Sequence, residues 1–234
     1  MNDRRLFLQA TATMGLTAFV PGITPVHADD KKKDKPDEEV GAAEDLMREH
    51  GVLNRVLLIY EEGLRRLHKK EEVAPDVFHK PATLVRKFVE DYHEKLEEKF
   101  IFSQFEKKNL LTDLTKTLRK QHEAGRVVTD VVLRLAVADQ FRKEENRKEV
   151  VTAVEAFIRM YRPHEAREDT VLFPSLPKVY TIKQLKELGE QFEKEEDRLF
   201  GDEGFEKTVD QVAGIEKQLG IYDLDQFTPK VSGK

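Results

Sequence analysis

Four stretches of the chain carry apolar residues at alternating intervals of three and four, the pattern of helices that each bury one face. The apolar positions are Leu46, Leu53, Leu57, Tyr60 and Leu64; Val85, Val89, Leu96 and Phe100; Leu111, Leu114, Leu118, Val132 and Ala136; and Val150, Val154, Phe157 and Tyr161. No alternating run with hairpin turn residues occurs, so no strand is predicted. Four long helices with short connections favour an all-α fold, an antiparallel up-down four-helix bundle.

Each of the four apolar seams also contains one histidine: His50, His93, His122 and His164. An unsatisfied buried imidazole costs about 1 to 3 kcal/mol, and a folded domain has a net stability of only about 5 to 15 kcal/mol. Four such histidines therefore need something to bind. A metal-free structural bundle, whose core histidines are hydrogen-bonded to neighbours, is the alternative interpretation.

The histidines belong to a duplicated pattern. His50 and His93 are separated by 43 positions, and His122 and His164 by 42. "HEKLEEKFIF" from His93 and "HEAREDTVLF" from His164 share a glutamate at the next position, a glutamate four later, an acid five later and a phenylalanine nine later. Two helical hairpins related by a pseudo-twofold axis would bring four histidines and two glutamates around one point.

Helix geometry favours the glutamate four residues after each of these histidines as its partner. Positions i and i+4 differ by about 40° around a helix, so Glu97 and Glu168 project with His93 and His164. The acids at i+5, Glu98 and Asp169, lie about 140° away and are expected to face solvent or a neighbouring helix. A nitrogen and oxygen ligand set without thiolate suits iron, manganese or zinc. Six ligands, two of them carboxylates that can bridge, indicate a dinuclear centre rather than a structural zinc site.

These motifs resemble the hemerythrin-like domains, also called HHE cation-binding domains, over Ala42 to Pro174. The resemblance implies a four-helix bundle that holds two non-haem iron ions. The implied ligands are His50, His93, Glu97, His122 and His164, together with Glu168 or Asp169. Oxygen-carrying members have the last acid at i+5, which is Asp169 here, whereas the internal repeat and helix geometry favour Glu168.

One position departs from the pattern of the oxygen carriers. They have a second histidine four residues after the one on the third helix, where this chain has Arg126, and a guanidinium cannot ligate a metal. Glu94 or Glu123 could supply an oxygen ligand instead, and Arg126 could pair with a metal-bound carboxylate. The leading hypothesis is a protein that binds O2, NO or peroxide, or holds iron. The alternative is a di-iron oxidoreductase of the peroxidase or oxidase kind.

The segments before the bundle suggest export. Residues 1–28 contain Arg4 and Arg5, an apolar run from Ala10 to Val20 and a cleavage-like "VHA" ending at Ala28, which resembles a bacterial twin-arginine signal peptide. A periplasmic or otherwise exported protein without a membrane span after cleavage is therefore expected. Residues 29–40 are predicted to be a charged flexible leader. The 45 acidic residues exceed the 40 basic ones, so no nucleic-acid partner is expected.

The bundle is expected to end at a pair of prolines, with more helices beyond it. It is assigned to residues 41–177, with Pro174 and Pro177 ending its fourth helix. Pro163 is expected to kink that helix and aim His164. Residues 178–234 are predicted to form an extension packed on the bundle, with helices at about Ile182–Phe200 and Glu203–Leu219. Its tail, with Tyr222, Leu224 and Phe227, is expected to lie over the bundle.

Overall fold

The first long helix, α1 (Ala42–His68), follows the first apolar seam of the sequence. Its first turn carries Glu44 and Asp45, and its last turn carries Arg65 and Arg66, charges that complement the helix dipole. The computed structural model describes residues 41–231. The predicted signal peptide (1–28) and charged leader (29–40) lie outside these residues.

The second helix is continuous but not uniform. It runs through α2 (Asp76–Leu84), η1 (Val85–His93), α3 (Glu94–Leu96), η2 (Glu97–Phe102) and α4 (Ser103–Lys107), of which η1 and η2 are π-helical. Pro81 lies inside α2. Pro81 is buried, so its packing against the core offsets the backbone hydrogen bond that it cannot donate.

The third and fourth helices complete the bundle. They are α5 (Thr112–Leu135) and α7 (Glu144–Arg167), joined by the short α6 (Ala138–Phe141). The fourth helix continues into the π-helical η3 (Glu168–Leu172) and then into the 3-10 helix η4 (Phe173–Lys178), which contains Pro174 and Pro177. Pro163 lies inside α7 without ending it.

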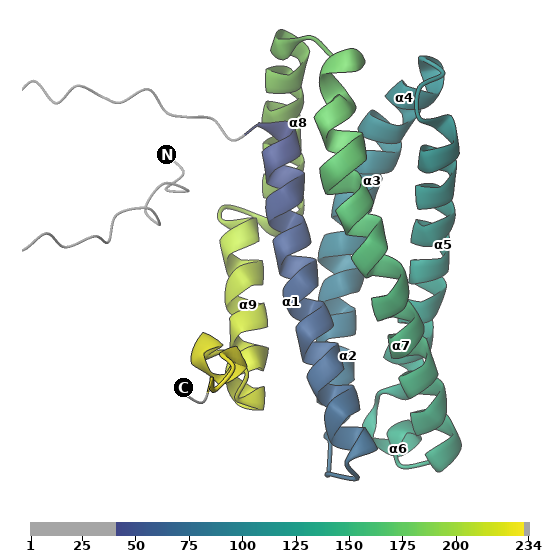
Figure 1. The fold of residues 1–234 in the computed structure, drawn as a ribbon, viewed down its shortest axis with the longest axis vertical. Coiled ribbons are helices and arrows are strands. Elements are labelled where there is room, and N and C mark those ends of the chain that lie inside the picture. The colour runs from purple at the N-terminus through teal and green to yellow at the C-terminus, as the bar shows by residue number, and fades with distance from the viewer. Residues whose placement is uncertain (1–40, 232–234) are drawn as a thin grey trace, which may run out of the picture. The chain divides into compact units, whose positions relative to one another are not determined.

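Successive long helices run in opposite directions, because their connections alternate between the two ends of the bundle (Figure 1). Leu46, Leu57, Phe102, Phe157 and Leu172 are among the fully buried side chains between them. The predicted all-α up-down bundle is therefore confirmed, and residues 41–231 contain no strand. Within the same residues, no helix is both long enough and apolar enough to cross a membrane.

Two further helices, α8 (Ile182–Phe200) and α9 (Gly204–Leu219), lie against α1 (Figure 1). Thr181 and Gln184 form a capping box at the start of α8. Arg55 of α1 binds both carboxylate oxygens of Glu216 on α9, at 2.9 and 2.5 Å. The predicted extension helices thus exist at nearly the expected positions.

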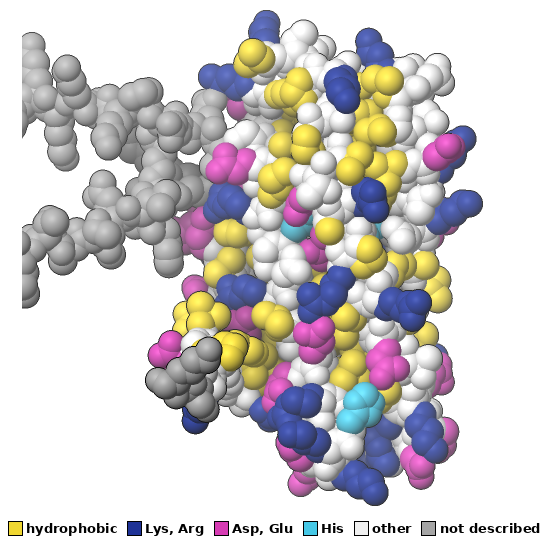
Figure 2. All heavy atoms as spheres, viewed as in Figure 1, with side chains coloured by type: hydrophobic (Ala, Val, Ile, Leu, Met, Phe, Trp, Pro, Cys, Tyr) yellow, Lys and Arg dark blue, Asp and Glu magenta, His cyan; other side chains and the backbone are white. Residues whose placement is uncertain are grey.

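The expectation that the tail lies over the bundle was wrong. Tyr222 is 50% exposed, Leu224 79% and Phe227 52% in the tail, which includes the 3-10 helix η5 (Leu224–Phe227). Hydrophobic side chains gather at the surface beside this end of the chain (Figure 2). Since α8 and α9 already cover α1, three apolar residues in a short segment have little remaining core surface to bury.

Candidate metal centre

The four predicted histidines come together in the middle of the bundle. His50 lies on α1, His93 at the end of η1, His122 on α5 and His164 on α7, and none is more than 3% exposed. The Nε2 atoms of His50 and His93 are 3.1 Å apart, and those of His122 and His164 are 3.2 Å apart. The helices therefore present two histidine pairs, one from each hairpin of the duplicated sequence.

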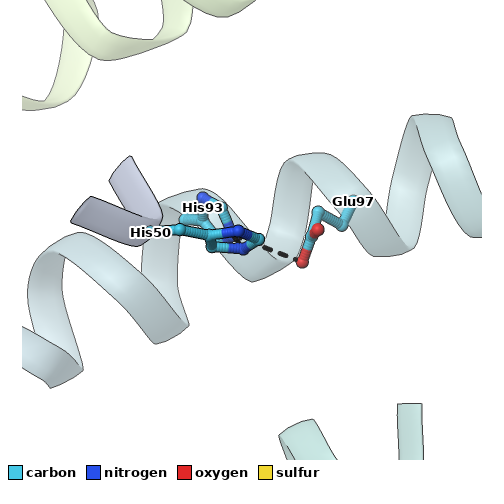
Figure 3. A group of neighbouring side chains, drawn as sticks. All are labelled: His50, His93 and Glu97. Carbon is cyan, nitrogen blue, oxygen red and sulfur yellow. Dashed lines mark hydrogen bonds and ion pairs between the residues drawn. The ribbon is translucent and has the colours of Figure 1, made fainter. Parts of the chain in front are cut away.

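Glu97 lies between the two pairs. Its Oε2 atom is 3.5 Å from Nε2 of His93 and 3.5 Å from Nε2 of His122. Figure 3 shows its carboxylate one helical turn beyond His93, turned toward the rings of His50 and His93. This carboxylate thus reaches one histidine of each pair, as a bridging ligand would.

Glu168 takes the matching position on the fourth helix. Its Oε2 atom is 3.4 Å from Nε2 of His50 and 3.1 Å from Nε2 of His164. Glu97 and Glu168 are fully buried, and none of their four carboxylate oxygens has a hydrogen-bond partner. Buried carboxylates without hydrogen-bond donors are strongly destabilising. The nitrogen and oxygen ligand atoms gathered here suit iron, manganese or zinc, the cations expected from the sequence.

The ring nitrogens facing away from the centre are all occupied. The pairs, with their distances from Nδ1, are His50 with Asp169 at 2.8 Å, His93 with Glu49 at 2.6 Å, His122 with Glu98 at 3.1 Å, and His164 with Gln121 at 2.9 Å. Because each partner offers an acceptor oxygen, Nδ1 donates in each pair. The Nε2 lone pairs are then directed into the centre, the arrangement typical of metal-binding histidines.

Glu98 and Asp169, two of the acids that bind outward-facing ring nitrogens, follow the same internal repeat as the histidines. Glu98 and Asp169 each follow the second histidine of a hairpin by five positions, and each binds the first histidine of the other hairpin. The neighbouring helix, one of the two expected surroundings of these acids, is therefore their partner.

Glu49 and Gln121 were not among the residues predicted from the sequence, although they immediately precede the first histidine of each hairpin in "REH" and "KQH". The internal repeat aligns these two positions. This alignment of Glu49 with Gln121 is the sequence signal from which a shared role of the two residues could have been predicted.

The charges of the centre are poorly matched without a cation. Burial lowers the pKa of His50, but its hydrogen bond with Asp169 and the negative charge of the nearby Glu168 outweigh burial and raise that pKa well above 6.5. Burial, together with the charge of His50, lowers the pKa of His93 well below 6.5. Of these two facing imidazoles, His50 therefore holds a second proton more readily than His93 does.

In the second histidine pair and the two central glutamates, burial and neighbouring charges also shift the pKa values. Burial, with the charge of His164 adding to it, lowers the pKa of His122 to about 4. Burial and then the charge of Glu168 raise the pKa of Glu97 well above 4.5. Burial also opposes the ionisation of Glu168, but His164 and His50 outweigh it and hold that pKa below 4.5.

The alternative ligands predicted from the sequence are Asp169, Glu94 and Glu123. They lie outside the group formed by the four histidines, Glu97 and Glu168. The Asp169 side chain is 36% exposed and binds the outward nitrogen of His50. Glu94 is buried, but its nearest approach to His122, 3.9 Å, is to Nδ1. Glu123 is exposed, and it belongs to none of the His and Glu groups that residues 41–231 bring together. As the residue directly after His122, it lies about 100° around the helix from it.

Arg126 pairs with carboxylates that flank the centre. Its Nη2 atom is 2.7 Å from Glu94 and 2.6 Å from Glu98. Glu94 also accepts a hydrogen bond from the Tyr161 hydroxyl at 2.6 Å. The duplicated counterpart of Glu94 is Glu165, which accepts from Asn54. Burial raises the pKa of Glu94 and that of Glu165 to about 8 each.

Comparisons with known proteins agree with this arrangement. The model of the hemerythrin HHE cation binding domain matches residues 41–176. The uncharacterized proteins Rv1995 of Mycobacterium tuberculosis and Mb2018 of Mycobacterium bovis are each 50% identical over 196 residues, which is 83% of this chain and 77% of theirs. No solved structure matches the chain. The chain therefore belongs to the family of hemerythrin HHE cation-binding domains.

Proposed function

We propose that the chain is a non-haem di-iron protein that binds O2, NO or peroxide, or holds iron, in its bundle core. Its ligand atoms form two groups, His50 with His93 and Glu97, and His122 with His164 and Glu168; within each, the atoms lie within 4.8 Å of one another. The observation that carries the proposal is the burial of four carboxylate oxygens without hydrogen-bond donors between four inward-facing imidazoles. Manganese and zinc fit the same donor set.

The protein's own residues perform three tasks in this proposal. The imidazoles and the two carboxylates would hold the cations, and the bound irons would supply the affinity for a small diatomic or peroxide ligand. The outer acceptors, such as Glu49 and Asp169, keep the proton on Nδ1 so that Nε2 stays available. The apolar layers around the centre keep bulk water away from it, which strengthens every charge interaction inside.

Metal analysis tests the proposal directly. Protein purified from iron-supplemented cells should contain about two metal ions per chain. Its absorption spectrum should change between anaerobic and aerobic solution. Glu168→Ala should lose most of the metal, whereas Asp169→Ala, its matched control, should retain both ions with weaker affinity. Far less than one metal ion per chain in the unaltered protein would leave the metal-free structural bundle as the better account.

A di-iron oxidoreductase is the second candidate, favoured by the position of Arg126. Its guanidinium binds Glu94 and Glu98 where the oxygen carriers have another imidazole, so each group offers two imidazoles and one carboxylate. Even if both carboxylates were shared between the two groups, these ligands would leave positions open on iron for a co-substrate. Steady consumption of peroxide with an added reductant would favour this enzyme, and a stable, reversible spectral change on oxygenation would favour the binding protein.

The proposal includes export by the twin-arginine route, with cleavage near Ala28, to the periplasm or beyond. The paired Arg4 and Arg5, followed by the apolar run, support it. Because that route transports folded proteins, the centre could be filled before export. Replacement of both arginines by lysine should retain the chain in the cytoplasm, as measured by cell fractionation, and an unchanged distribution would contradict this route.

A further inference from the structure

We infer that the two halves of the centre differ in affinity, and that the half formed by His50, His93 and Glu97 binds the first cation. The half formed by His122, His164 and Glu168 then binds the second cation more weakly. The inference rests on the proposed function, because it concerns how the same centre fills. It adds an order of binding that the duplicated ligands themselves, two histidines and one glutamate in each half, do not predict.

The first difference lies in the residues that precede the first histidine of each hairpin. His93 donates from Nδ1 to the carboxylate of Glu49 at 2.6 Å, whereas His164 donates to the amide oxygen of Gln121 at 2.9 Å. A carboxylate on the outer nitrogen makes an imidazole a stronger metal ligand than a neutral acceptor does. His93 is therefore the stronger ligand of this duplicated pair.

The second difference lies in the acids five residues after the second histidines. Asp169 binds Nδ1 of His50 and, within residues 41–231, forms no ion pair with a lysine or arginine. Glu98 binds Nδ1 of His122, but its charge is shared with Arg126 at 2.6 Å and with Lys95 at 3.0 Å. Glu98 therefore transfers less negative charge to its histidine than Asp169 does.

The third difference is the charge around each half. Asn54 and Arg126 stand at duplicated positions, four residues after His50 and His122, so a neutral amide flanks one half and a cation flanks the other. Carboxylate oxygens of Asp45 and Glu196 lie within 4.8 Å of a carboxylate oxygen of Glu49, and Arg48, 3.7 Å from Asp45, offsets part of this negative charge. All three differences make the surroundings of His50 and His93 more negative, which favours a divalent cation there.

Zinc titration of the full chain, stripped of metal, tests the order without redox chemistry. We expect two calorimetric steps, with the first dissociation constant about 10- to 100-fold lower, the range typical of changes in the partners of metal ligands. His164→Ala should keep the tight step and lose the weak one, and His93→Ala should lose the tight one. Two equal steps would overturn the inference but not the proposed function, whereas no zinc binding would overturn both.

A charge exchange gives the sharper test. Glu49→Gln combined with Gln121→Glu leaves the net charge unchanged and should reduce or reverse the gap between the two steps. Gln121→Glu alone should tighten the second step and leave the first, which keeps the test available if the double variant folds poorly. Glu123→Gln, a control at an exposed position next to His122, should change neither step. A gap that stays the same in the Gln121→Glu variant would also overturn the inference.

Discussion

Glu97 shows most directly how a binding function conflicts with stability in this core. It is fully buried, neither of its carboxylate oxygens has a hydrogen-bond donor, and burial followed by the charge of Glu168 raises its pKa well above 4.5. Without a cation, the folded chain must either hold a poorly solvated charge or take up a proton. Such groups persist where function requires them, and they lower the stability of the empty protein.

Glu97→Gln should therefore stabilise the metal-free protein at pH 7, by about 1 to 3 kcal/mol. Because the folded-state pKa is raised, the folded chain holds more protons than the unfolded chain above pH 4.5, and the stability of the unaltered protein falls as pH rises through that range. The gain should disappear below about pH 4, where the carboxylate is protonated in both states. Urea unfolding with a chelator at both pH values measures it. A less stable variant at pH 7 would contradict the prediction.

Tyr161 and Gly125 form a second contact that tolerates little change. A β-carbon added at Gly125 would stand 2.1 Å from the Tyr161 hydroxyl, which donates to Glu94 at 2.6 Å. Gly125→Ala should cost about 1 to 3 kcal/mol of unfolding free energy, because the buried phenol must move. Combining it with Tyr161→Phe should recover part of that cost, since the closest clashing atom is removed.

The matched control for this pair is Gly51→Ala in α1. Nothing lies within 4 Å of its added β-carbon, and Gly51 is exposed. This substitution should stabilise the helix by up to about 1 kcal/mol. Equal effects of alanine at Gly51 and Gly125 in urea unfolding would show that the phenol is not confined by Gly125.

The helices and their histidines were predictable from the sequence, but the π-helical turns were not. Apolar spacing and the internal repeat predicted the four seams and the inward direction of Glu97 and Glu168. The turns η2 and η3 begin at these two glutamates, so the duplication extends to the backbone. A π-turn depends on which contacts the neighbouring helices offer, here His50 and His122, and π-turns are frequent at functional sites. Local residue preferences contain no such information.

Pro163 directly precedes the candidate ligand His164 on the fourth helix. It is exposed inside α7, one residue before His164, and it leaves the carbonyl of Arg159 without its usual helical donor. Pro163→Ala should restore that hydrogen bond, remove the predicted kink and shift His164, which should change the iron content or the absorption spectrum. Arg162→Ala, next to it and also exposed, should change neither. Unchanged iron content and spectrum in Pro163→Ala would contradict the aiming role.

The extension beyond the bundle illustrates where periodic patterns stop being informative. The helices predicted at about Ile182–Phe200 and Glu203–Leu219 match α8 and α9 within one residue at each end. Tyr222, Leu224 and Phe227 had no such periodicity, and their apolar character alone predicted a covered position that the structure does not have. A helix is locally encoded, whereas the burial of a tail depends on whether other elements leave it any surface.

Truncation separates the contributions of α9 and the tail to stability. Ending the chain after Ile221 removes a segment whose described residues, 222–231, are all exposed, and should change the unfolding free energy by less than about 0.5 kcal/mol. Ending it after Gly201 also removes the buried Val212, Ile215 and Leu219. Each such aliphatic side chain contributes about 1.5 to 3 kcal/mol, so their sum is comparable with a whole domain's stability of about 5 to 15 kcal/mol.

The shorter chain should therefore unfold at a much lower urea concentration or fail to accumulate as folded protein. It also loses Glu216, the partner of Arg55 on α1, so that arginine must find water instead. The midpoints of the two truncated chains, compared with that of the full chain in the same buffer, measure the difference. Equal midpoints for all three would mean that the bundle is stable without α9, and that the apolar face of α1 toward α9 contributes little to folding.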